Sequence, residues 1–169
     1  RDGDDYVLNG TKRFITGGGV SKLYIYYAVT DPDAGSRGIS AFILEDSMPG
    51  FEIGKHEDKL GIRGSPTTEV ICTDVRVPVE NRLGDEGQGF PQALRALDHS
   101  RVTIGAQAVG IAQGAFDYAL AYTQEREQFG QPIADFQGIQ FMLADQAMPS
   151  EAARGMVSQA AAMADRDDP

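Results

Sequence analysis

The residues best suited to chemistry lie in the stretch YTQEREQFGQPI, which runs from Tyr122 to Ile133. Arg126 stands there between two glutamates, and Gln128 and Gln137 come soon after it. A guanidinium can bind a phosphate through two parallel hydrogen bonds, and the N–H groups at the start of a helix favour an anion. A glycine and a proline after charged residues are also typical of an ordinary helix end in solvent. Spacing alone leaves both interpretations open.

Asp98 and Arg101 form a second candidate, further back in the chain. Their spacing of three predicts an ion pair within a helix, which stabilises the helix by only about 0.2–0.5 kcal/mol. Arg101 also shares a helix face with Leu97 and Ile104. A charge on an apolar face costs free energy unless it is paired or faces a cleft, so ligand contact is a second interpretation. His99 projects elsewhere and is expected at the surface.

Composition excludes several other kinds of site. Cys72 is the only cysteine, so it can form neither a disulfide framework nor a four-ligand zinc site, and its strand-like surroundings predict a buried thiol. The net charge is −10 and no basic stripe follows any segment, which argues against a nucleic-acid surface. No nucleotide-binding glycine motif, H-E-x-x-H or G-x-S-x-G occurs. The run 17–19 of glycines predicts a turn, and His56 lies in a polar loop.

The chain also lacks the sequence signals of a membrane or secreted protein. No apolar run reaches the roughly 18 residues that a membrane-spanning helix needs. No signal peptide opens the chain. We therefore expect a protein with no membrane span, in a reducing compartment of the cytoplasmic type.

The elements that position these residues change in character near Gly84. Residues 1–83 contain five or six short β-type runs separated by turn residues, with Asn9-Gly10 as a hairpin signal. Strands without intervening helices predict an antiparallel sheet, sandwich or barrel. Residues 84–169 have the periodicity of long helices. The predicted fold class is α+β: an antiparallel β-barrel or sandwich part, followed by antiparallel long helices.

One apolar helix face is predicted from Phe90 to Tyr122, where apolar residues recur every three or four positions for about nine turns. Small residues crowd this stretch, so we expect another helix to approach it closely. That second helix is predicted from about Asp135, with Pro149 as a kink, an interruption or a start. The short connection predicts an antiparallel pair. Two helices do not enclose a bundle core, so we expect the chain to oligomerise or to be part of something longer.

Several segments together resemble the acyl-CoA dehydrogenase family. They are GDDYVLNGTKRFITGG, KLGIRGSPTTEVICTDVRVPVENRLGDEGQGF, ALDHSRVTIGAQAVGIAQGAFDYALAYTQEREQFGQPI and FQGIQFMLADQAM. The similarity runs through essentially the whole chain, in order. It implies that residues 1–83 are the later part of the family's middle β-domain. Residues 84–169 would then be the first part of its C-terminal helical domain, an incomplete four-helix bundle.

The resemblance implies a flavoprotein that binds FAD and oxidises an acyl-CoA thioester to the trans-2-enoyl-CoA. In the family a carboxylate removes the α-proton, the β-hydrogen leaves as hydride to the flavin, and the electrons pass to an electron-transferring flavoprotein. Family members are usually homotetramers and act in fatty-acid β-oxidation. The implied partners are therefore acyl-CoA, the electron-transferring flavoprotein and further copies of the chain. The implied compartment is a bacterial cytoplasm or the mitochondrial matrix.

The resemblance also implies cofactor contacts. Phe14, Ile15 and Thr16 match the family's flavin-contacting strand, in which an aromatic ring packs by the isoalloxazine and the threonine hydrogen-bonds near N5. The family usually has Trp at the position of Phe14 and Asn at that of Gly17. The other contacts match the R-x-[QT]-F-G motif, whose arginine reaches the FAD pyrophosphate of a neighbouring subunit, and a glutamine in the same corner: Arg126, Gln128, Phe129 and Gln137.

A CoA-thioester segment and an acyl pocket are implied on the long helix. Their residues are Leu97, Asp98, His99, Ser100, Arg101 and Ile104. Most family members carry the catalytic glutamate late in the C-terminal domain, which would lie beyond residue 169. A minority carry it at the position of Ser100, and serine cannot serve as that base. No catalytic residue is therefore assigned, and this chain alone is not expected to turn over substrate.

Two alternatives stay open at this point. An acyl-CoA oxidase-like relative would let oxygen reoxidise the flavin, and fast reaction of the reduced intact protein with oxygen would identify it. A non-catalytic fragment or pseudo-enzyme would only assemble with partners, in keeping with the missing base and the half-built FAD site.

Overall fold

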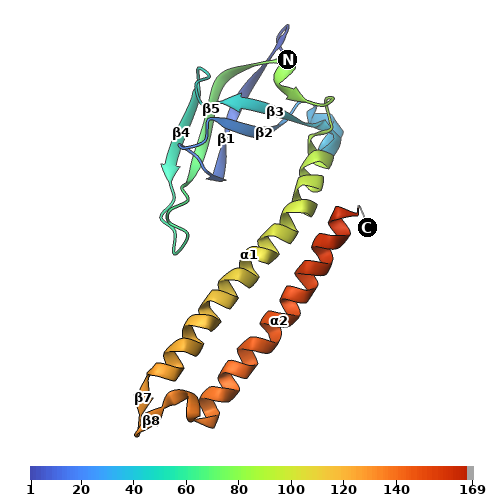
Figure 1. The fold of residues 1–169 in the computed structure, drawn as a ribbon. Coiled ribbons are helices and arrows are strands. Elements are labelled where there is room, and N and C mark those ends of the chain that lie inside the picture. The colour runs from blue at the N-terminus through green and yellow to red at the C-terminus, as the bar shows by residue number, and fades with distance from the viewer. Residues whose placement is uncertain (167–169) are drawn as a thin grey trace. The chain divides into compact units, whose positions relative to one another are not determined.

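The computed structural model describes residues 1–166. The chain divides into two compact units, one comprising Arg1–Leu94 and the other beginning at Arg95. The first unit contains two small sheets and the start of a long helix, and the second contains the rest of that helix and an antiparallel neighbour (Figure 1). The predicted α+β class is therefore confirmed.

Two three-stranded antiparallel sheets make up the β part, in the orders β1-β5-β4 and β2-β3-β6. Their bounds are β1 Asp5–Thr16, β2 Leu23–Val29, β3 Ile39–Glu45, β4 Phe51–His56, β5 Thr67–Pro78 and β6 Arg82–Leu83. Two 3₁₀ turns, η1 Pro32–Gly38 and η2 Val79–Asn81, connect strands. The pairing is antiparallel, as predicted, and the described residues form no closed barrel.

The core of the first unit is built from residues that alternate along both sheets, as one-sided burial of a strand requires. Aromatic rings from the two sheets meet there: Tyr6 contacts Phe42, and Tyr24 contacts Phe51, with ring centroids 4.8 Å apart in each pair. Cys72 is buried in the same cluster, which confirms the predicted buried thiol.

The Asn9-Gly10 pair is not a hairpin turn, so that prediction was wrong. β1 continues through it, and the pairing passes from Leu8 opposite Val75 to Gly10 opposite Cys72. One residue of β1 therefore faces two of β5, which is a β-bulge. The alternating burial of β5 changes phase at this point, so residues on both sides of the bulge still point into the core. A dipeptide that favours turns can equally well support a bulge.

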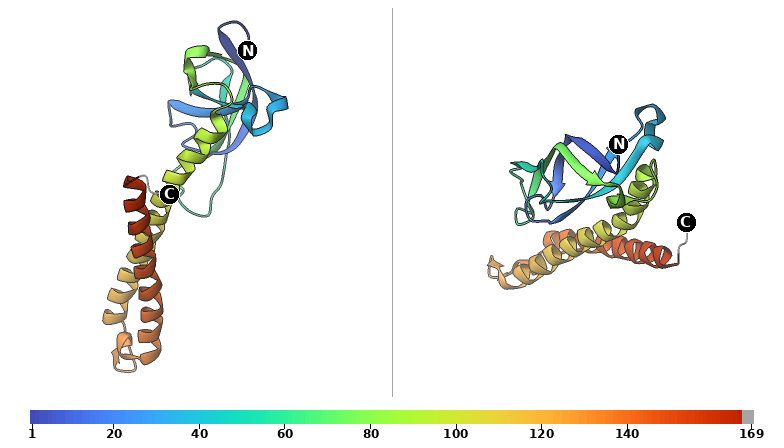
Figure 2. Two further views of the ribbon diagram at one scale, coloured as in Figure 1. Left: turned by 90° about the vertical axis from the view of Figure 1, so that its right-hand side faces the viewer. Right: turned by 90° about the horizontal axis from the view of Figure 1, so that it is seen from above.

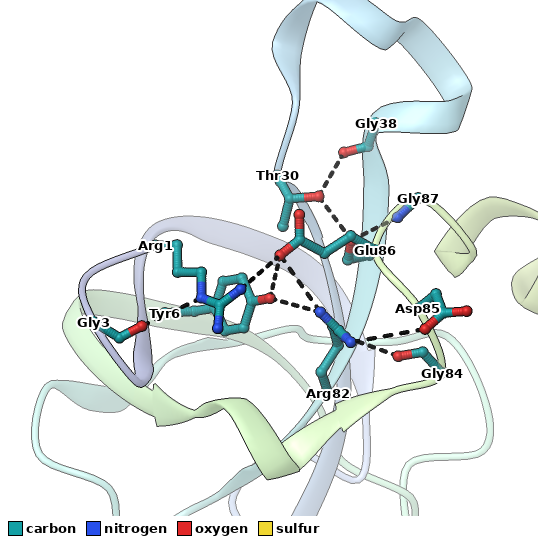
Figure 3. A network of polar contacts seen from close by, with 11 residues as sticks. Arg1, Gly3, Tyr6, Thr30, Gly38, Arg82, Gly84, Asp85, Glu86 and Gly87 are labelled. Atoms are coloured by element: carbon teal, nitrogen blue, oxygen red, sulfur yellow. Dashed lines mark hydrogen bonds and ion pairs between the residues drawn. The ribbon is translucent and has the colours of Figure 1, made fainter.

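A polar network holds the loop that precedes the first helix. Figure 3 shows Glu86 between three side chains: it accepts a hydrogen bond from Tyr6 and lies 3.5 Å from Arg82 and 4.0 Å from Arg1. Arg82 in turn donates to the Tyr6 hydroxyl at 2.9 Å. The buried Ser40 hydroxyl accepts from the backbone N–H of Gly87 at 3.0 Å. These contacts hold the loop that leads into the first helix against the strands β1, β3 and β6.

Two long helices, α1 (Gly89–Glu125) and α2 (Gln137–Asp165), lie side by side and antiparallel within the second unit (Figure 1, Figure 2). A short ladder of β7 (Glu127–Gln128) and β8 (Gln131–Pro132) joins them, followed by the 3₁₀ turn η3 (Ile133–Asp135). The predicted antiparallel pair is confirmed. α2 continues through Pro149 without the interruption that the proline suggested.

The face of α1 that α2 covers is not the apolar face predicted from the sequence. The covered seam consists of buried or half-buried residues: Val102, Gly105, Val109, Gln113, Phe116, Leu120 and Thr123. A Cβ on Gly105 would lie 3.1 Å from a methyl group of Val157, and Arg154 donates to the Gln113 side chain at 2.5 Å. The predicted stripe is largely exposed, with Ile104 and Ile111 at 62% and 63%. α1 therefore has two apolar seams, and the small residue at 105 lets α2 approach one of them.

None of the described helices is both long and apolar enough to cross a membrane.

Candidate functional site

Phe14 lies in a second bulge of the β1–β5 pair, this time with the extra residue on β1. The pairing passes from Lys12 opposite Val70 to Ile15 opposite Thr68, so two residues of β1 face one of β5. Phe14 takes a left-handed backbone with φ of 58°. Its side chain is 69% exposed. A left-handed conformation is costly for a bulky residue, and bulges next to functional sites re-aim a side chain. The bulge therefore holds an aromatic ring out into solvent at an energetic cost.

The two residues after Phe14 alternate between core and surface. Ile15 packs against the core cluster, whereas Thr16 is exposed at the last position of β1. The chain then turns at once, with the N–H of Gly17 bonded to the carbonyl of Pro66 at 2.9 Å. A Cβ on Gly18 would lie 1.8 Å from the Thr68 hydroxyl oxygen, so only glycine fits there. The predicted turn at 17–19 is confirmed, and it leaves Thr16 accessible beside Phe14.

The connection between the two helices contains Arg126, Gln128 and Phe129, and Gln137 is the first residue of α2. The backbone of Arg126 is held by two hydrogen bonds. Its N–H donates to the carbonyl of Tyr122, and its carbonyl accepts from the N–H of Ile133 at 2.8 Å. Its side chain is exposed, and among residues 1–166 the guanidinium has no hydrogen-bond or ion-pair partner. A rigid backbone thus presents an unpaired cation.

The neighbours of Arg126 in this corner are also exposed. Phe129 takes a left-handed backbone with φ of 54° and is 93% exposed. Its ring meets that of Phe136 edge-on at 6.2 Å. Gln137 begins α2, and no side chain caps that end of the helix. N–H groups in the first turn of a helix lack intrahelical partners, so they are available to an anion or a hydroxyl.

The six residues predicted to contact substrate lie on consecutive turns of α1. Asp98 and Arg101 form the predicted ion pair, with 3.4 Å between carboxylate and guanidinium, and both side chains are mostly exposed. Ser100 donates its hydroxyl to the carbonyl of Leu97 at 3.1 Å, and His99 contacts the carbonyl of Arg95. Leu97 and Ile104 are exposed on the uncovered seam of α1.

These residues form three groups: Phe14 to Thr16 at the end of β1, the corner from Arg126 to Gln137, and the turns from Leu97 to Ile104. Within residues 1–166 no group of His, Cys, Asp and Glu side chains is arranged to hold a metal. The sequence did not indicate that Phe14 and Phe129 have left-handed backbones. The available signal was the glycine close behind each of them, which marks a turn without saying which neighbour carries the strain.

Two family models match the chain. The acyl-CoA dehydrogenase middle domain matches residues 1–75, and the acyl-CoA dehydrogenase C-terminal domain matches residues 87–169. The probable acyl-CoA dehydrogenase fadE25 of Mycobacterium leprae is 58% identical over 99% of this chain and 43% of its own length. The chain therefore spans less than half the length of such relatives.

Solved structures agree with this match. The butyryl-CoA dehydrogenase of Megasphaera elsdenii has a TM-score of 0.97 at 50% identity, covering 100% of this chain and 44% of its own. A chain in the structure of the electron transferring flavoprotein of Acidaminococcus fermentans has a TM-score of 0.98 at 51% identity, with 100% and 44% covered. Since two domains of one family match nearly every residue in order, the chain belongs to the acyl-CoA dehydrogenase family.

Proposed function

We propose that this chain is part of an FAD-dependent acyl-CoA dehydrogenase, which converts an acyl-CoA thioester to the trans-2-enoyl-CoA. The observation that supports this most is a pair of exposed aromatic rings, on Phe14 and Phe129. Both are held by a left-handed backbone, and both fall where the family's FAD contacts are expected. Both rings are exposed and outside the core, so a ligand gives a reason for their strained backbones.

The residues at these positions suit the parts of FAD that they would hold. Arg126 is exposed and unpaired among the described residues, and a guanidinium fits a pyrophosphate bidentately. Gln137 and the uncapped start of α2 would add neutral donors beside that charge. Phe14 offers a ring for stacking, and the exposed Thr16 offers a hydroxyl for a ring nitrogen. FAD, when bound, would supply the acceptor for the hydride.

The substrate would lie along the turns from Leu97 to Ile104. The ion pair of Asp98 and Arg101 is solvent-exposed and therefore weak, so either group can exchange its partner for a polar part of acyl-CoA. Leu97 and Ile104 would line an aliphatic pocket. The Ser100 hydroxyl is bonded to the backbone and is no base, so the proposed α-proton abstraction needs a carboxylate from outside these residues.

The partners and the boundary are also proposals. An electron-transferring flavoprotein is the acceptor we propose, in view of the 51% identity to a chain in the Acidaminococcus fermentans structure. We place the boundary between the two domain parts at residues 83 and 84, and we propose a homotetramer. Because the relatives described above are bacterial, a bacterial cytoplasm is the proposed compartment.

The test is retention of FAD by the protein that carries these residues. Visible absorption after gel filtration should show a flavin band, and addition of a saturated acyl-CoA should bleach it if the base is present. Arg126→Ala should weaken FAD retention roughly tenfold or more, since hydrogen bonds to charged groups are stronger than neutral ones. Arg95→Ala removes the same charge from an exposed site on α1 and serves as the control. Equal FAD affinity in both variants would remove Arg126 from the site.

A further inference from the structure

Asn9 is the asparagine of this chain that is better placed to lose its amide group. The sequence contains two asparagines, and only Asn9 is followed by glycine, whereas Asn81 is followed by Arg82. A glycine presents no side chain that would hinder attack by its backbone nitrogen. Asn9 and Gly10 are both exposed, and both line an open groove of about 410 Å³ beside β1 and β2, so water reaches them.

The Asn9 amide is held at both ends by one residue. Its Nδ2 donates to the Asp74 carboxylate at 2.9 Å, and its Oδ1 accepts from the Asp74 backbone N–H at 2.8 Å. Asp74 takes a left-handed backbone with φ of 50°, which is what brings its N–H and its carboxylate to the same partner. We call this pair the Asn9–Asp74 clamp.

We propose that Asn9 is a site of spontaneous deamidation whose rate the Asn9–Asp74 clamp holds down. In the first step the backbone nitrogen of Gly10 attacks Cγ of Asn9, a C–N bond forms, the Cγ–Nδ2 bond breaks, and ammonia leaves with the proton of the Gly10 nitrogen. In the second step water adds to one of the two carbonyl carbons of the cyclic imide. The ring then opens to aspartate or to isoaspartate, and no oxidant or reductant is needed.

The clamp opposes the first step directly. When the Gly10 nitrogen attacks, Cγ becomes tetrahedral and the amide group must turn, and this movement is opposed by the two hydrogen bonds to Asp74 and by the β1–β5 pairing on either side of Asn9. Both hydrogen bonds of the clamp must break, and one of them is to a carboxylate, which makes it stronger than a neutral one. The folded chain therefore keeps a reactive dipeptide in an unreactive geometry.

The product would not rebuild the clamp. A carboxylate at position 9 has no donor to offer Asp74, so two carboxylates would face each other across the bulge. Isoaspartate also inserts an extra backbone carbon into β1, five residues before Phe14. Deamidation should therefore destabilise the strand that carries the predicted flavin contacts, although the proposal does not depend on FAD.

The experiment is ageing of the full chain at mildly alkaline pH, followed by peptide mass spectrometry and isoaspartate detection. We expect modification at Asn9, with Asn81 intact as an internal control. Asp74→Gly removes the carboxylate, and glycine accepts the left-handed backbone, so its initial rate should rise roughly tenfold on loss of one charge-assisted hydrogen bond. Asp74→Asn keeps a neutral side-chain acceptor, so its rate should lie between those of the wild type and Asp74→Gly.

A second measurement does not rely on a variant that folds. The wild-type chain unfolded in urea should deamidate at Asn9 at least roughly tenfold faster than the folded chain, because the clamp is absent. Equal rates in the folded and unfolded chain would overturn the proposal. So would preferential modification of Asn81, or a folded Asp74→Gly variant that ages at the wild-type rate.

Discussion

At the scale of single residues, two of the proposed cofactor contacts, Phe14 and Phe129, have a strained backbone. Within residues 1–166, four non-glycine residues have a positive φ: Phe14, Ile62, Asp74 and Phe129. Asp74 is explained by its bonds to Asn9. The two phenylalanines form no part of the core, and burial therefore does not compensate for their strain. Strain that packing does not require is more often kept for function than for stability.

Phe14→Gly should separate the contribution of this residue to FAD binding from its contribution to stability. Glycine removes the left-handed penalty but adds backbone entropy to the unfolded chain, so the free energy of unfolding should stay equal or rise by up to about 1 kcal/mol. FAD retention should fall, because no ring remains to stack. Thermal unfolding and flavin absorbance measure the two quantities, and Phe14→Tyr, which keeps a ring, is the control. Loss of stability together with unchanged FAD retention would show that Phe14 serves packing.

Arg101 offers the corresponding test for the substrate. Arg101→Ala should lower kcat/KM for acyl-CoA roughly tenfold in the intact enzyme, since it removes a charge-assisted hydrogen bond. The same variant should leave the melting temperature unchanged, because an exposed ion pair contributes little to stability. Steady-state kinetics with Arg95→Ala as the control decide the matter, and wild-type kinetics for Arg101→Ala would remove it from the site.

At the scale of elements, the contact between α1 and α2 depends on one small residue. Gly105 faces Val157 closely, whereas a Cβ on Gly114 would meet nothing within 4 Å. Gly105→Leu should destabilise the helix pair by about 1–3 kcal/mol through overpacking. Gly114→Ala should stabilise it by about 0.5–1 kcal/mol through helix propensity. Unfolding in urea, followed by circular dichroism, compares them, and equal shifts would show that α2 does not pack on the Gly105 seam.

Two buried acidic groups in the sheet core should make the stability of the fold depend on pH in the alkaline range. Burial raises the pKa of the Tyr26 hydroxyl, which lies by the Cys72 thiol, and burial likewise raises the pKa of that thiol. The folded chain thus keeps protons that the unfolded chain releases above ordinary pKa values of 9.0 for Cys and 10.0 for Tyr. Stability is fully present below these values and decreases as pH rises above them.

Tyr26→Phe should reduce this alkaline loss, because one of the two buried acids is removed. Melting temperature against pH measures it, with the partly exposed Tyr27→Phe as the control. If both variants lose stability above the ordinary tyrosine pKa as steeply as the wild type does, the effect lies elsewhere.

At the scale of the whole molecule, the second seam of α1 remains uncovered. Its apolar residues recur every seven positions: Leu97, Ile104, Ile111 and Tyr118. This is the spacing by which one helix packs along another. The isolated chain should therefore associate as its concentration rises, and Ile111→Glu should weaken association whereas Gln107→Glu should not. Sedimentation velocity measures this, and a chain that stays monomeric at high concentration would contradict it.

The sequence predicted which segments are strands and which are helices better than it predicted what each of them packs against. Hydrophobic spacing correctly indicated two long helices, and the short connection between them indicated that they are antiparallel. The ion pair of Asp98 with Arg101 followed from helix geometry alone. The spacing could not say which seam of α1 would be covered, because both repeat every three or four residues. The prediction of a hairpin at Asn9-Gly10 was wrong for a similar reason, since the bulge found there and a turn need the same permissive backbone.

The exposed bulge at Phe14 has a practical consequence for optical work. The chain contains no tryptophan, so Phe14→Trp would introduce a single indole at a position where the side chain is already exposed. Its emission would come from one known place in a background of tyrosine alone. Quenching of that emission on titration with flavin would report the distance between this strand and the isoalloxazine, in a chain that needs no chemical labelling.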